Sequence, residues 1–260
     1  MKIFALSDLH LSFGGNKPMD IFGDRWRDHA DKIAAAWGRI GGDDLVLIAG
    51  DVSWAMKLRD TAADFAYLRA LPGHKVFIRG NHDYWWDSLK KNHAAAGDKF
   101  YFIQNNAVVF GDLAVTGTRL WNFPFVKWEA SLFVQRATRE SAASAQEPPA
   151  SRGEDAEKIR AHELERLRRG LDALPRDAKL KIVLTHFPPI GADAAANDIT
   201  RLLADYGVQI CLYGHLHGLL TGGEENTGGG LRYDCVIDGT RYVLTSADYL
   251  NFTPLEIAAG

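Results

Sequence analysis

The sequence predicts an α/β protein built from two packed β-sheets flanked by helices. Short apolar runs rich in β-branched residues, which are typical of buried strands, alternate with longer stretches of helical periodicity. The strands outnumber those that a single open sheet needs. The glycine-rich fingerprint that opens a Rossmann fold is absent, so a doubly wound dinucleotide-binding fold is not expected.

The first half of the chain alternates strand and helix. Phe65, Leu68 and Leu71 recur at helical spacing, and Pro72-Gly73 ends that helix. Turn residues at Asn105-Asn106 and at 111–112 separate three short strands. In order, we expect a strand at 3–6, a loop at 11–28, a helix to about 37, a strand at 45–49, a helix at 59–71, a strand at 75–79, a helix at about 84–95, and strands near 100–104, 107–110 and 113–117.

Residues 119–154 break this alternation, and we expect a loop-rich insert there. The segment begins with aromatic residues and ends in a Ser/Ala/Pro/Glu-rich stretch, a composition typical of loops. An apolar stripe from Ile159 to Leu174 then indicates an amphipathic helix. In order, we expect a helix at 155–174, a strand at 180–185, a helix near 193–206, a strand at 208–213, and two antiparallel strands at 231–237 and 241–246 joined by the turn Asp238-Gly239. No second core is required, so residues 1–260 are expected to form one domain.

The composition is that of an ordinary globular enzyme, with 47% hydrophobic and 24% charged residues. A net charge of −3 gives no global positive field for nucleic acid or anionic lipid. Cys211 and Cys235 lie inside apolar runs, which favours buried core residues over a disulfide framework or a thiolate metal site. The N-terminus lacks a signal-peptide pattern and no apolar run reaches transmembrane length, so a cytosolic location is expected.

Five of the predicted strands end within one to three residues of a side chain that can bind metal. In sheets of this kind, ligands gather beyond the carboxyl ends of the strands. The simplest interpretation is a two-metal hydrolytic site. The polar residues at the five ends are Asp8 and His10, Asp51, then Asn81, His82 and Asp83, then His186, and finally His215 and His217.

The spacing of these residues suits coordination. In Asp8-Leu9-His10 the two polar side chains are separated by one residue, so in extended chain both point to the same face, and His215-Leu216-His217 repeats the device. Asp51 at a strand end can bridge two ions. Oxygen and imidazole donors without cysteine suit Mn²⁺, Fe²⁺, Zn²⁺ or Co²⁺, and they do not select one of these. Two divalent ions carry more charge than the two Asp carboxylates, so the site should attract phosphate.

Each piece has an ordinary explanation when it is taken alone. Asp-x-His is more often a surface turn, Gly-Asp is common in loops, and a single His186 after a strand is more often a buried histidine with a satisfied hydrogen bond. The pair His215 and His217 is stronger evidence, because paired histidines at a strand end seldom serve packing. All five pieces in this order leave little room for coincidence.

Together these residues resemble the calcineurin-like metallophosphoesterase family, whose pattern is D-x-H, G-D, G-N-H-D/E, H and G-H-x-H in that order. Every element is present between residues 8 and 217. The resemblance implies a four-layer α/β/β/α sandwich of two mixed β-sheets with a dinuclear centre. By similarity, Asp8, His10 and His217 hold one ion, Asn81, His186 and His215 hold the other, and Asp51 bridges both. His82 resembles the family's non-ligand histidine, which contacts the phosphoryl group or protonates the leaving oxygen, and Asp83 would orient it.

The resemblance implies a metal-dependent phosphohydrolase in which a metal-bridging hydroxide attacks a phosphomonoester or a phosphodiester in line. Val52-Ser53-Trp54 after the Gly-Asp motif departs from the protein Ser/Thr phosphatases, and His82 departs from the lipid A precursor hydrolases. The expected substrate is a small phosphoester or a nucleotide. One alternative is a nuclease with the same metal chemistry, which the lack of a basic stripe disfavours. Another is a non-catalytic metal-binding scaffold, which would be expected to have lost ligands.

Aromatic and basic residues surround these motifs. All seven tryptophans lie in the first half of the chain, and Trp54 follows the Gly-Asp motif directly. They form an aromatic wall for the substrate or, more simply, the core at the ends of the sheets. Arg119, just past a predicted strand, is a candidate to bind substrate phosphate, although an arginine exposed without a role is equally consistent with its position. The basic residues of the first loop, including Lys17, are expected to be solvated.

Overall fold

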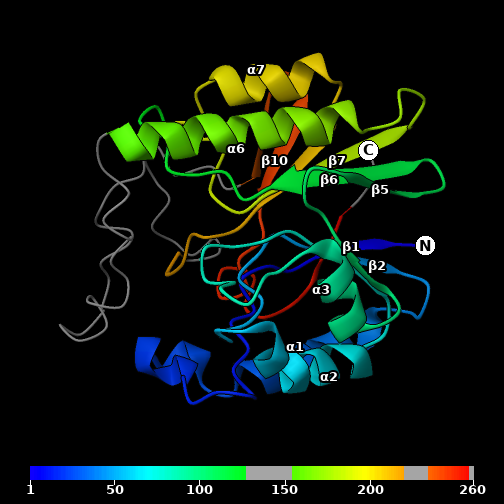
Figure 1. The fold of residues 1–260 in the computed structure, drawn as a ribbon, viewed down its shortest axis with the longest axis vertical. Helices are drawn as coiled ribbons and strands as arrows, with labels where there is room; N and C mark the ends of the chain where they lie inside the picture. Colours follow the sequence, from blue (N-terminus) through cyan, green and yellow to red (C-terminus); the bar gives the residue numbers. More distant parts are fainter. Residues whose placement is uncertain (127–153, 220–233, 258–260) are drawn as a thin grey trace.

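The protein is a four-layer sandwich in which two β-sheets lie between two layers of helices (Figure 1). The computed structural model describes residues 1–126, 154–219 and 234–257. Helices α6 (Glu154–Asp172) and α7 (Asp198–Asp205) cover one sheet, whereas α1 (His29–Ala36), α2 (Ala62–Ala70) and α3 (Leu89–Ala96) cover the other. The predicted α/β fold with two sheets flanked by helices is therefore confirmed.

The first sheet has five strands in the order β11-β1-β2-β3-β4. Four of them run parallel, and β11 pairs with β1 in the antiparallel direction. Parallel pairing brings the carboxyl ends of β1, β2 and β3 to the same edge of the sheet. The strands are β1 (Ile3–Ala5), β2 (Leu45–Ile48), β3 (His74–Phe77), β4 (Phe100–Phe102) and β11 (Leu255–Glu256).

The second sheet has six strands in the order β5-β6-β7-β8-β10-β9. The four central strands are parallel, and the two edge strands are antiparallel to their neighbours, so this sheet is also mixed. The strands are β5 (Ala107–Phe110), β6 (Leu113–Thr118), β7 (Leu180–Thr185), β8 (Ile210–Tyr213), β9 (Asp234–Ile237) and β10 (Thr240–Leu244).

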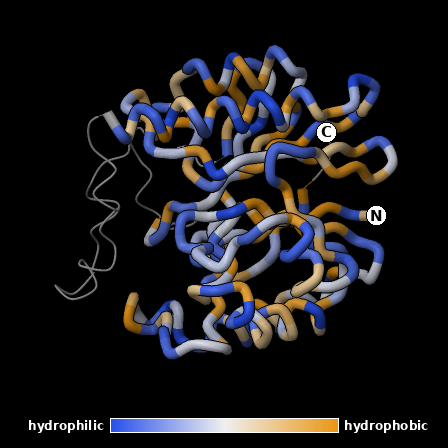
Figure 2. The backbone as a smooth tube through the Cα atoms, viewed as in Figure 1, coloured by the Kyte–Doolittle hydropathy of each residue, from blue (hydrophilic) through white to orange (hydrophobic). Residues whose placement is uncertain are grey.

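Three hydrophobic cores separate the four layers and explain why the strands are apolar on both faces (Figure 2). In β1, Phe4 faces the core shared with α1 and α2, whereas Ile3 and Ala5 face the core between the sheets. The same alternation separates Val46 from Leu45 in β2. A strand covered on both faces needs continuous apolar sequence, which is the pattern that predicted these strands.

The two sheets meet at the end of β1, where Ser7 forms hydrogen bonds with both of them. Its backbone N–H donates to the carbonyl of Thr245 at 2.7 Å, and its Oγ accepts from the backbone N–H of Ala49 at 2.7 Å. An isolated bridge also pairs Ser7 with Ser246. The loops after β1, β2 and β10 are therefore fixed to one another at a single place on the molecule.

Several boundaries differ from the prediction. Helix α3 begins at Leu89 and not near 84, helix α7 begins at Asp198 and not near 193, and the loop at 11–28 contains two 3₁₀ turns. Strand β11 was not predicted. Residues 127–153 of the expected insert and the first three residues of the strand expected at 231–237 lie outside the described residues. Within the described ranges, every helix is too short or too polar to cross a membrane.

Candidate metal centre

All seven of the side chains predicted to bind metal converge at one edge of the sandwich. They extend from the loops that follow β1, β2 and β3 of the first sheet and β7 and β8 of the second. The site therefore lies across the junction of the two sheets, beside the Ser7 hydrogen bonds. Two groups of donors can be distinguished within it.

The first group consists of Asp8, His10 and His217. Their ligand atoms all lie within 4.8 Å of one another, as required for a shared cation. His10 Nε2 is 3.1 Å from His217 Nε2, and His217 Nε2 is 3.7 Å from an Asp8 carboxylate oxygen. The structure thus brings together the three residues that the resemblance assigned to one ion.

The second group consists of Asn81, His186 and His215. The amide oxygen of Asn81 lies 2.6 Å from His186 Nε2 and 3.1 Å from His215 Nδ1. Asp51 lies between the two groups, with one carboxylate oxygen 3.4 Å from His186 Nε2 and 3.8 Å from His10 Nε2. A carboxylate in that position can contact an ion in each group.

The chemistry of the donor set fits cations. His186 Nδ1 lies 2.9 Å from the carbonyl oxygen of Ala49, which can only accept a hydrogen bond, so Nδ1 carries the proton and Nε2 is left bare. This unprotonated nitrogen faces the oxygens of Asn81 and Asp51. All of these atoms carry lone pairs, and at such short distances they repel one another unless a positive charge lies between them. No cationic side chain of the described residues lies between these atoms, so divalent ions are the fitting occupants.

Asp248 is a functional residue that the sequence analysis missed. Its carboxylate is buried, with 1% of the residue exposed, and accepts hydrogen bonds from His217 Nδ1 at 2.8 Å and from the backbone N–H of Gly218 at 2.7 Å. Burial alone would lower the pKa of His217, but the charge and hydrogen bond of Asp248, together with the charges of Asp8 and Asp51, raise that pKa to about 9. Carboxylates behind a ligating histidine fix its tautomer and its orientation. Asp248 follows the end of β10 closely, so the strand-end pattern that revealed the other residues would also have indicated it.

Four of the seven ligand residues have a left-handed backbone, which non-glycine residues rarely adopt. These residues are Asp8 with φ 57°, His10 with φ 46°, Asp51 with φ 52° and His215 with φ 73°. The loops turn sharply enough there to direct side chains from the strand ends into one site. Backbone strain of this kind collects where surrounding structure holds a functional geometry.

Two glycines of the motifs are required by space. A Cβ at Gly80 would collide with the carboxylate and backbone of Asp51, and a Cβ at Gly214 would collide with the carboxylate of Asp8. The glycines of Gly-Asn-His-Asp and Gly-His-Leu-His therefore let one loop pass directly against a ligand from another. Substitution of either would displace a ligand.

Burial sets the charge states of the donors. It raises the pKa of Asp8 to about 8, with a contribution from Asp51, and it raises the pKa of Asp51 as well. Burial also lowers the pKa of His186 to about 3 and places the pKa values of His10 and His215 well below their usual range. The imidazoles of His10, His186 and His215 are therefore neutral at pH 7, as metal binding requires, whereas Asp8 and His217 hold protons that bound cations would displace.

His82 and Asp83 have different surroundings. Asp83 does not orient the His82 ring, as the resemblance implied, because its carboxylate accepts hydrogen bonds from the backbone N–H groups of Gly80, Asp51 and Val52 and from Trp85 Nε1. It holds the two ligand loops together. The His82 Nδ1 is buried without a hydrogen-bond partner among the described residues, and burial lowers the pKa of this ring to about 4.

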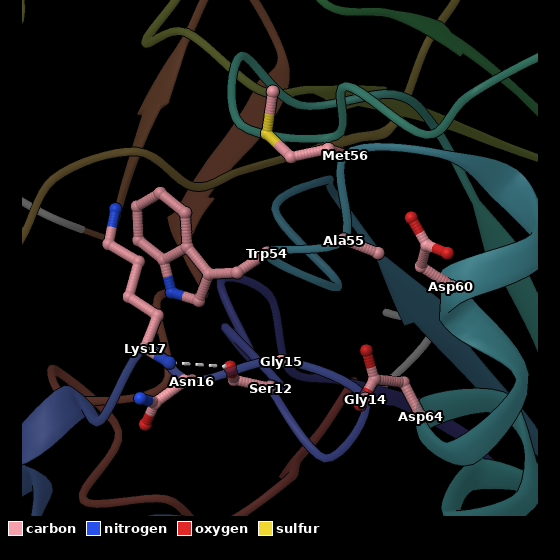
Figure 3. Close-up of a pocket in the computed structure, with 10 residues that line it drawn as sticks. All are labelled: Ser12, Gly14, Gly15, Asn16, Lys17, Trp54, Ala55, Met56, Asp60 and Asp64. Atoms are coloured by element: carbon pink, nitrogen blue, oxygen red, sulfur yellow. Dashed lines mark hydrogen bonds between the residues drawn. The ribbon is translucent and has the colours of Figure 1, made fainter.

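Trp54 forms an aromatic wall beside the site and also packs, partly buried, against the core of the first sheet, so both interpretations of the tryptophans stay open for it. Its indole stacks on His10 with 4.8 Å between ring centroids and lies 4.4 Å from His82. Lys17 is not merely solvated, because its Nζ lies 3.2 Å from the Trp54 ring centroid. A cavity of about 250 Å³ extends from this wall toward Met56 and Asp60, and Figure 3 shows Lys17 running alongside the indole. Trp85, in contrast, is part of the core.

Arg119 lies on the other side of the centre. Its Nη2 is 3.4 Å from the buried Glu163, and its guanidinium carbon is 4.7 Å from the ring centroid of Trp121. The side chain is 20% exposed, so it is held in place and not free in solvent. The backbone N–H of Phe187, the residue after His186, donates to the carbonyl of Arg119 at 2.9 Å, which places Arg119 beside the second group of donors.

Comparison with known proteins identifies the family and structures of similar fold. Residues 1–219 match the family model described as calcineurin-like phosphoesterase. Among solved structures, a phosphopantetheinyl hydrolase from Mycobacterium tuberculosis is similar with a TM-score of 0.56 and 14% identity, over 100% of this chain and 96% of that one. A protein of unknown function from Aquifex aeolicus is similar with a TM-score of 0.44 and 12% identity, over 98% and 95% of the two chains. No curated protein matches this sequence.

Proposed function

This chain belongs to the calcineurin-like phosphoesterase family, and we propose that it is a dinuclear metal-dependent hydrolase of a small phosphoester or nucleotide. The observation that carries the proposal is the convergence of seven oxygen and nitrogen donors into two groups that share Asp51. Asp8, His10 and His217 would hold one ion, and Asn81, His186 and His215 would hold the other. The donor types suit Mn²⁺, Fe²⁺, Zn²⁺ or Co²⁺.

When bound, two divalent ions polarise the phosphoryl oxygens and lower the pKa of water, which makes in-line displacement at phosphorus accessible near neutral pH. The protein's own contribution is to hold the donors before the substrate arrives. Asp83 fixes the loops of Asp51 and Gly80 through backbone hydrogen bonds, and Asp248 fixes His217. Both carboxylates are positioning residues.

His82 is the side chain that we assign to the substrate. It lies against Trp54 and beside the ligand His10, with 5.8 Å between the two imidazole centroids. With its pKa lowered to about 4 by burial, the ring is neutral at pH 7 and can donate a hydrogen bond to a phosphoryl or leaving-group oxygen. Arg119 supplies a positive charge on the opposite side.

Elemental analysis and two chromogenic substrates test the proposal. The purified protein should contain two equivalents of transition metal and should hydrolyse p-nitrophenyl phosphate, bis-p-nitrophenyl phosphate or both with added Mn²⁺. Preference for the first would make it a monoesterase, and preference for the second a diesterase. Activity that survives a chelator, or a fully loaded protein that is silent on both substrates and on a panel of nucleotides, would contradict the proposal.

The two alternative functions have distinct outcomes in the same experiment. A nuclease would degrade single-stranded or duplex DNA or RNA much faster than it hydrolyses bis-p-nitrophenyl phosphate, which is itself a phosphodiester. A scaffold would bind metal and hydrolyse nothing, but all seven donors and His82 are present, which disfavours it. The expected cytosolic location stays a prediction.

A further inference from the structure

A group of arginines lies beside the second group of metal donors and has too few negative charges around it. Glu163, of which 1% is exposed, accepts from Arg119 at 3.4 Å and from Arg166 at 3.0 Å on one carboxylate oxygen. Its other oxygen accepts from the hydroxyl of Thr118 at 2.6 Å. One carboxylate therefore already serves two guanidinium groups.

Arg79 is a third arginine in this region and lies two residues before the ligand Asn81. In the part of the chain that the structure describes, its side chain has neither a hydrogen bond nor an ion pair, and its Nε is buried without a partner. The Nε of Arg119 is buried and unpartnered in the same way. Each arginine therefore presents a buried N–H donor with nothing to accept from it.

The two arginines belong to strand ends that pack directly against each other. Arg79 follows Ile78 and Arg119 follows Thr118, and a Cβ at Gly117 would lie 3.0 Å from the side chain of Ile78. Burial lowers the pKa of Arg119, Glu163 opposes this effect, and the charge of Arg79 adds to the lowering. The positive charge of Arg79 thus acts on Arg119, and an anion beside the two guanidinium groups would offset their repulsion.

We propose that Arg79 and Arg119 form an oxyanion-binding subsite that holds a phosphate group of the substrate next to the Asn81, His186 and His215 donors. This inference rests on the proposed function for the identity of the ligand. Guanidinium groups present planar pairs of donors that match phosphate oxygens, and two cations suit a phosphate dianion better than a single carboxylate. Trp121 contributes a third buried and unpartnered donor, its Nε1, directly below the Arg119 guanidinium.

The phosphate has two possible sources that share this chemistry. It is either the phosphoryl group under attack or a second phosphate of the same substrate. Three probes separate them: inorganic phosphate and adenosine monophosphate carry one phosphate, and adenosine diphosphate carries two. Binding of each to the Mn²⁺-loaded protein is measured by calorimetry with Mn²⁺ in excess, and competition against p-nitrophenyl phosphate is measured in parallel.

Arg79→Met and Arg119→Met should each weaken binding by about ten- to hundredfold, as expected for a lost hydrogen bond to a charged group. Metal content should stay as in the unmodified protein, whereas Arg119→Met removes a partner of the buried Glu163 and should lower the thermal midpoint, as Arg166→Met should. Weaker binding of all three probes assigns the subsite to the phosphoryl group under attack, and weaker binding of adenosine diphosphate alone assigns it to a second phosphate. Arg166→Met is the matched control, because Arg166 shares Glu163 but has no buried, unpartnered Nε.

Unchanged binding of all three probes in both methionine variants would overturn the subsite, as would an equal loss in Arg166→Met. Arg79→Lys and Arg119→Lys keep the charge but remove the planar pair of donors, so a smaller loss of the same sign is expected. If a methionine variant loses metal, the lysine variant at the same position is used instead. Unchanged affinity of the lysine variants for the three probes would then overturn the inference. A protein that binds phosphate in this arginine-dependent manner but hydrolyses nothing would refute the proposed function and leave the subsite standing.

Discussion

His82 is the side chain on which the proposed chemistry depends most at the scale of single residues. Among the described residues, its ring forms no hydrogen bond to a donor of the metal centre, and Trp54 rather than a carboxylate packs against it. A ring with these surroundings can be removed without disturbing the ligands. It therefore separates the binding of metal from the rate of reaction.

Replacing His82 with alanine should leave two equivalents of metal and lower kcat by about 10²–10⁴-fold, the range for a lost proton-transfer or hydrogen-bonding group. Asp51→Asn is the comparison, and it should lose metal and activity together because Asp51 lies between both groups of donors. Metal analysis and steady-state kinetics on the same preparations check this. A His82→Ala protein without metal would show that the ring is a ligand.

Asp248→Asn should weaken one of the two metal ions by about 10–100-fold, because loss of a carboxylate behind a ligating histidine has this effect. His217 would lose the partner that fixes its Nδ1–H, while the second group of donors keeps all of its contacts. Chelator competition monitored by metal release measures the change for each ion. Asp234→Asn removes an exposed partner of Arg241 and should change neither ion, and equal retention of both ions in Asp248→Asn would refute the role of Asp248.

At the scale of secondary-structure elements, the start of α7 depends on one capping residue near the site. The side chain of Asn197 accepts from the backbone N–H groups of Ile199 and Thr200, and the hydroxyl of Thr200 accepts from the backbone N–H of Asn197. Asn197 also donates to the carbonyl of Pro189 in the loop after His186. The cap thus connects a helix of the outer layer to a loop that carries a ligand.

Asn197→Ala should lower the free energy of unfolding by about 0.5–2 kcal/mol, the usual cost of a lost N-cap. Urea denaturation of the metal-free protein measures it without a contribution from metal binding. Ser88→Ala is the matched control, because Ser88 occupies the N-cap of α3 but makes no capping hydrogen bond. A loss in Ser88→Ala as large as that in Asn197→Ala would show that the effect does not come from capping.

The elements also show how far the sequence alone can go. The buried apolar strands were predicted correctly because burial on both faces leaves a continuous signal, and the convergence of the seven predicted donors could be anticipated because they follow such strands. The start of α3 was placed too early because residues after Asp83 form turns, which the contacts of the Asp83 side chain impose. Strand β11 has two residues and is defined by its pairing with β1, so it carries no periodicity to detect.

At the scale of the whole molecule, the metal centre joins the two sheets. Asp8, His10, Asp51 and Asn81 come from loops of the first sheet, whereas the other three ligands come from loops of the second. Without cations, buried groups whose protonation differs between the folded and unfolded states control the stability of the folded protein. Divalent ions should therefore change both the stability and its dependence on pH.

Between pH 7 and pH 8.5, the metal-free protein should lose stability as the pH rises. The folded pKa of Asp8 is raised by burial to about 8, so the unfolded chain, with a normal Asp pKa, binds fewer protons in this range. His217 acts in the same direction. Burial lowers its folded pKa, but Asp248, together with Asp8 and Asp51, raises that pKa to about 9. The stability that protonated His217 contributes is therefore lost as the pH approaches 9. The lowered pKa of His186 matters only below about 6.5, where the unfolded ring takes up a proton.

Thermal midpoints measured with chelator and with Mn²⁺ at the two pH values test this. The gap between loaded and metal-free protein should widen at pH 8.5, because cations compensate the ionised carboxylates and bind better when ligands are deprotonated. Asp8→Asn removes the largest contributor and should flatten the metal-free profile. A metal-free protein that is more stable at pH 8.5 than at pH 7 would contradict the charge states described for the centre.

The left-handed backbone at four of the ligands has a consequence for how this sequence can change during evolution. A non-glycine residue in this conformation costs about 1–2 kcal/mol more than glycine would, and at these four positions the side chain of a predicted ligand would be lost in exchange. A lineage that abandoned hydrolysis would therefore gain stability by drifting to glycine or asparagine at these four positions. Glycines in place of Asp8, His10, Asp51 and His215 would mark an inactive descendant more clearly than scattered losses elsewhere.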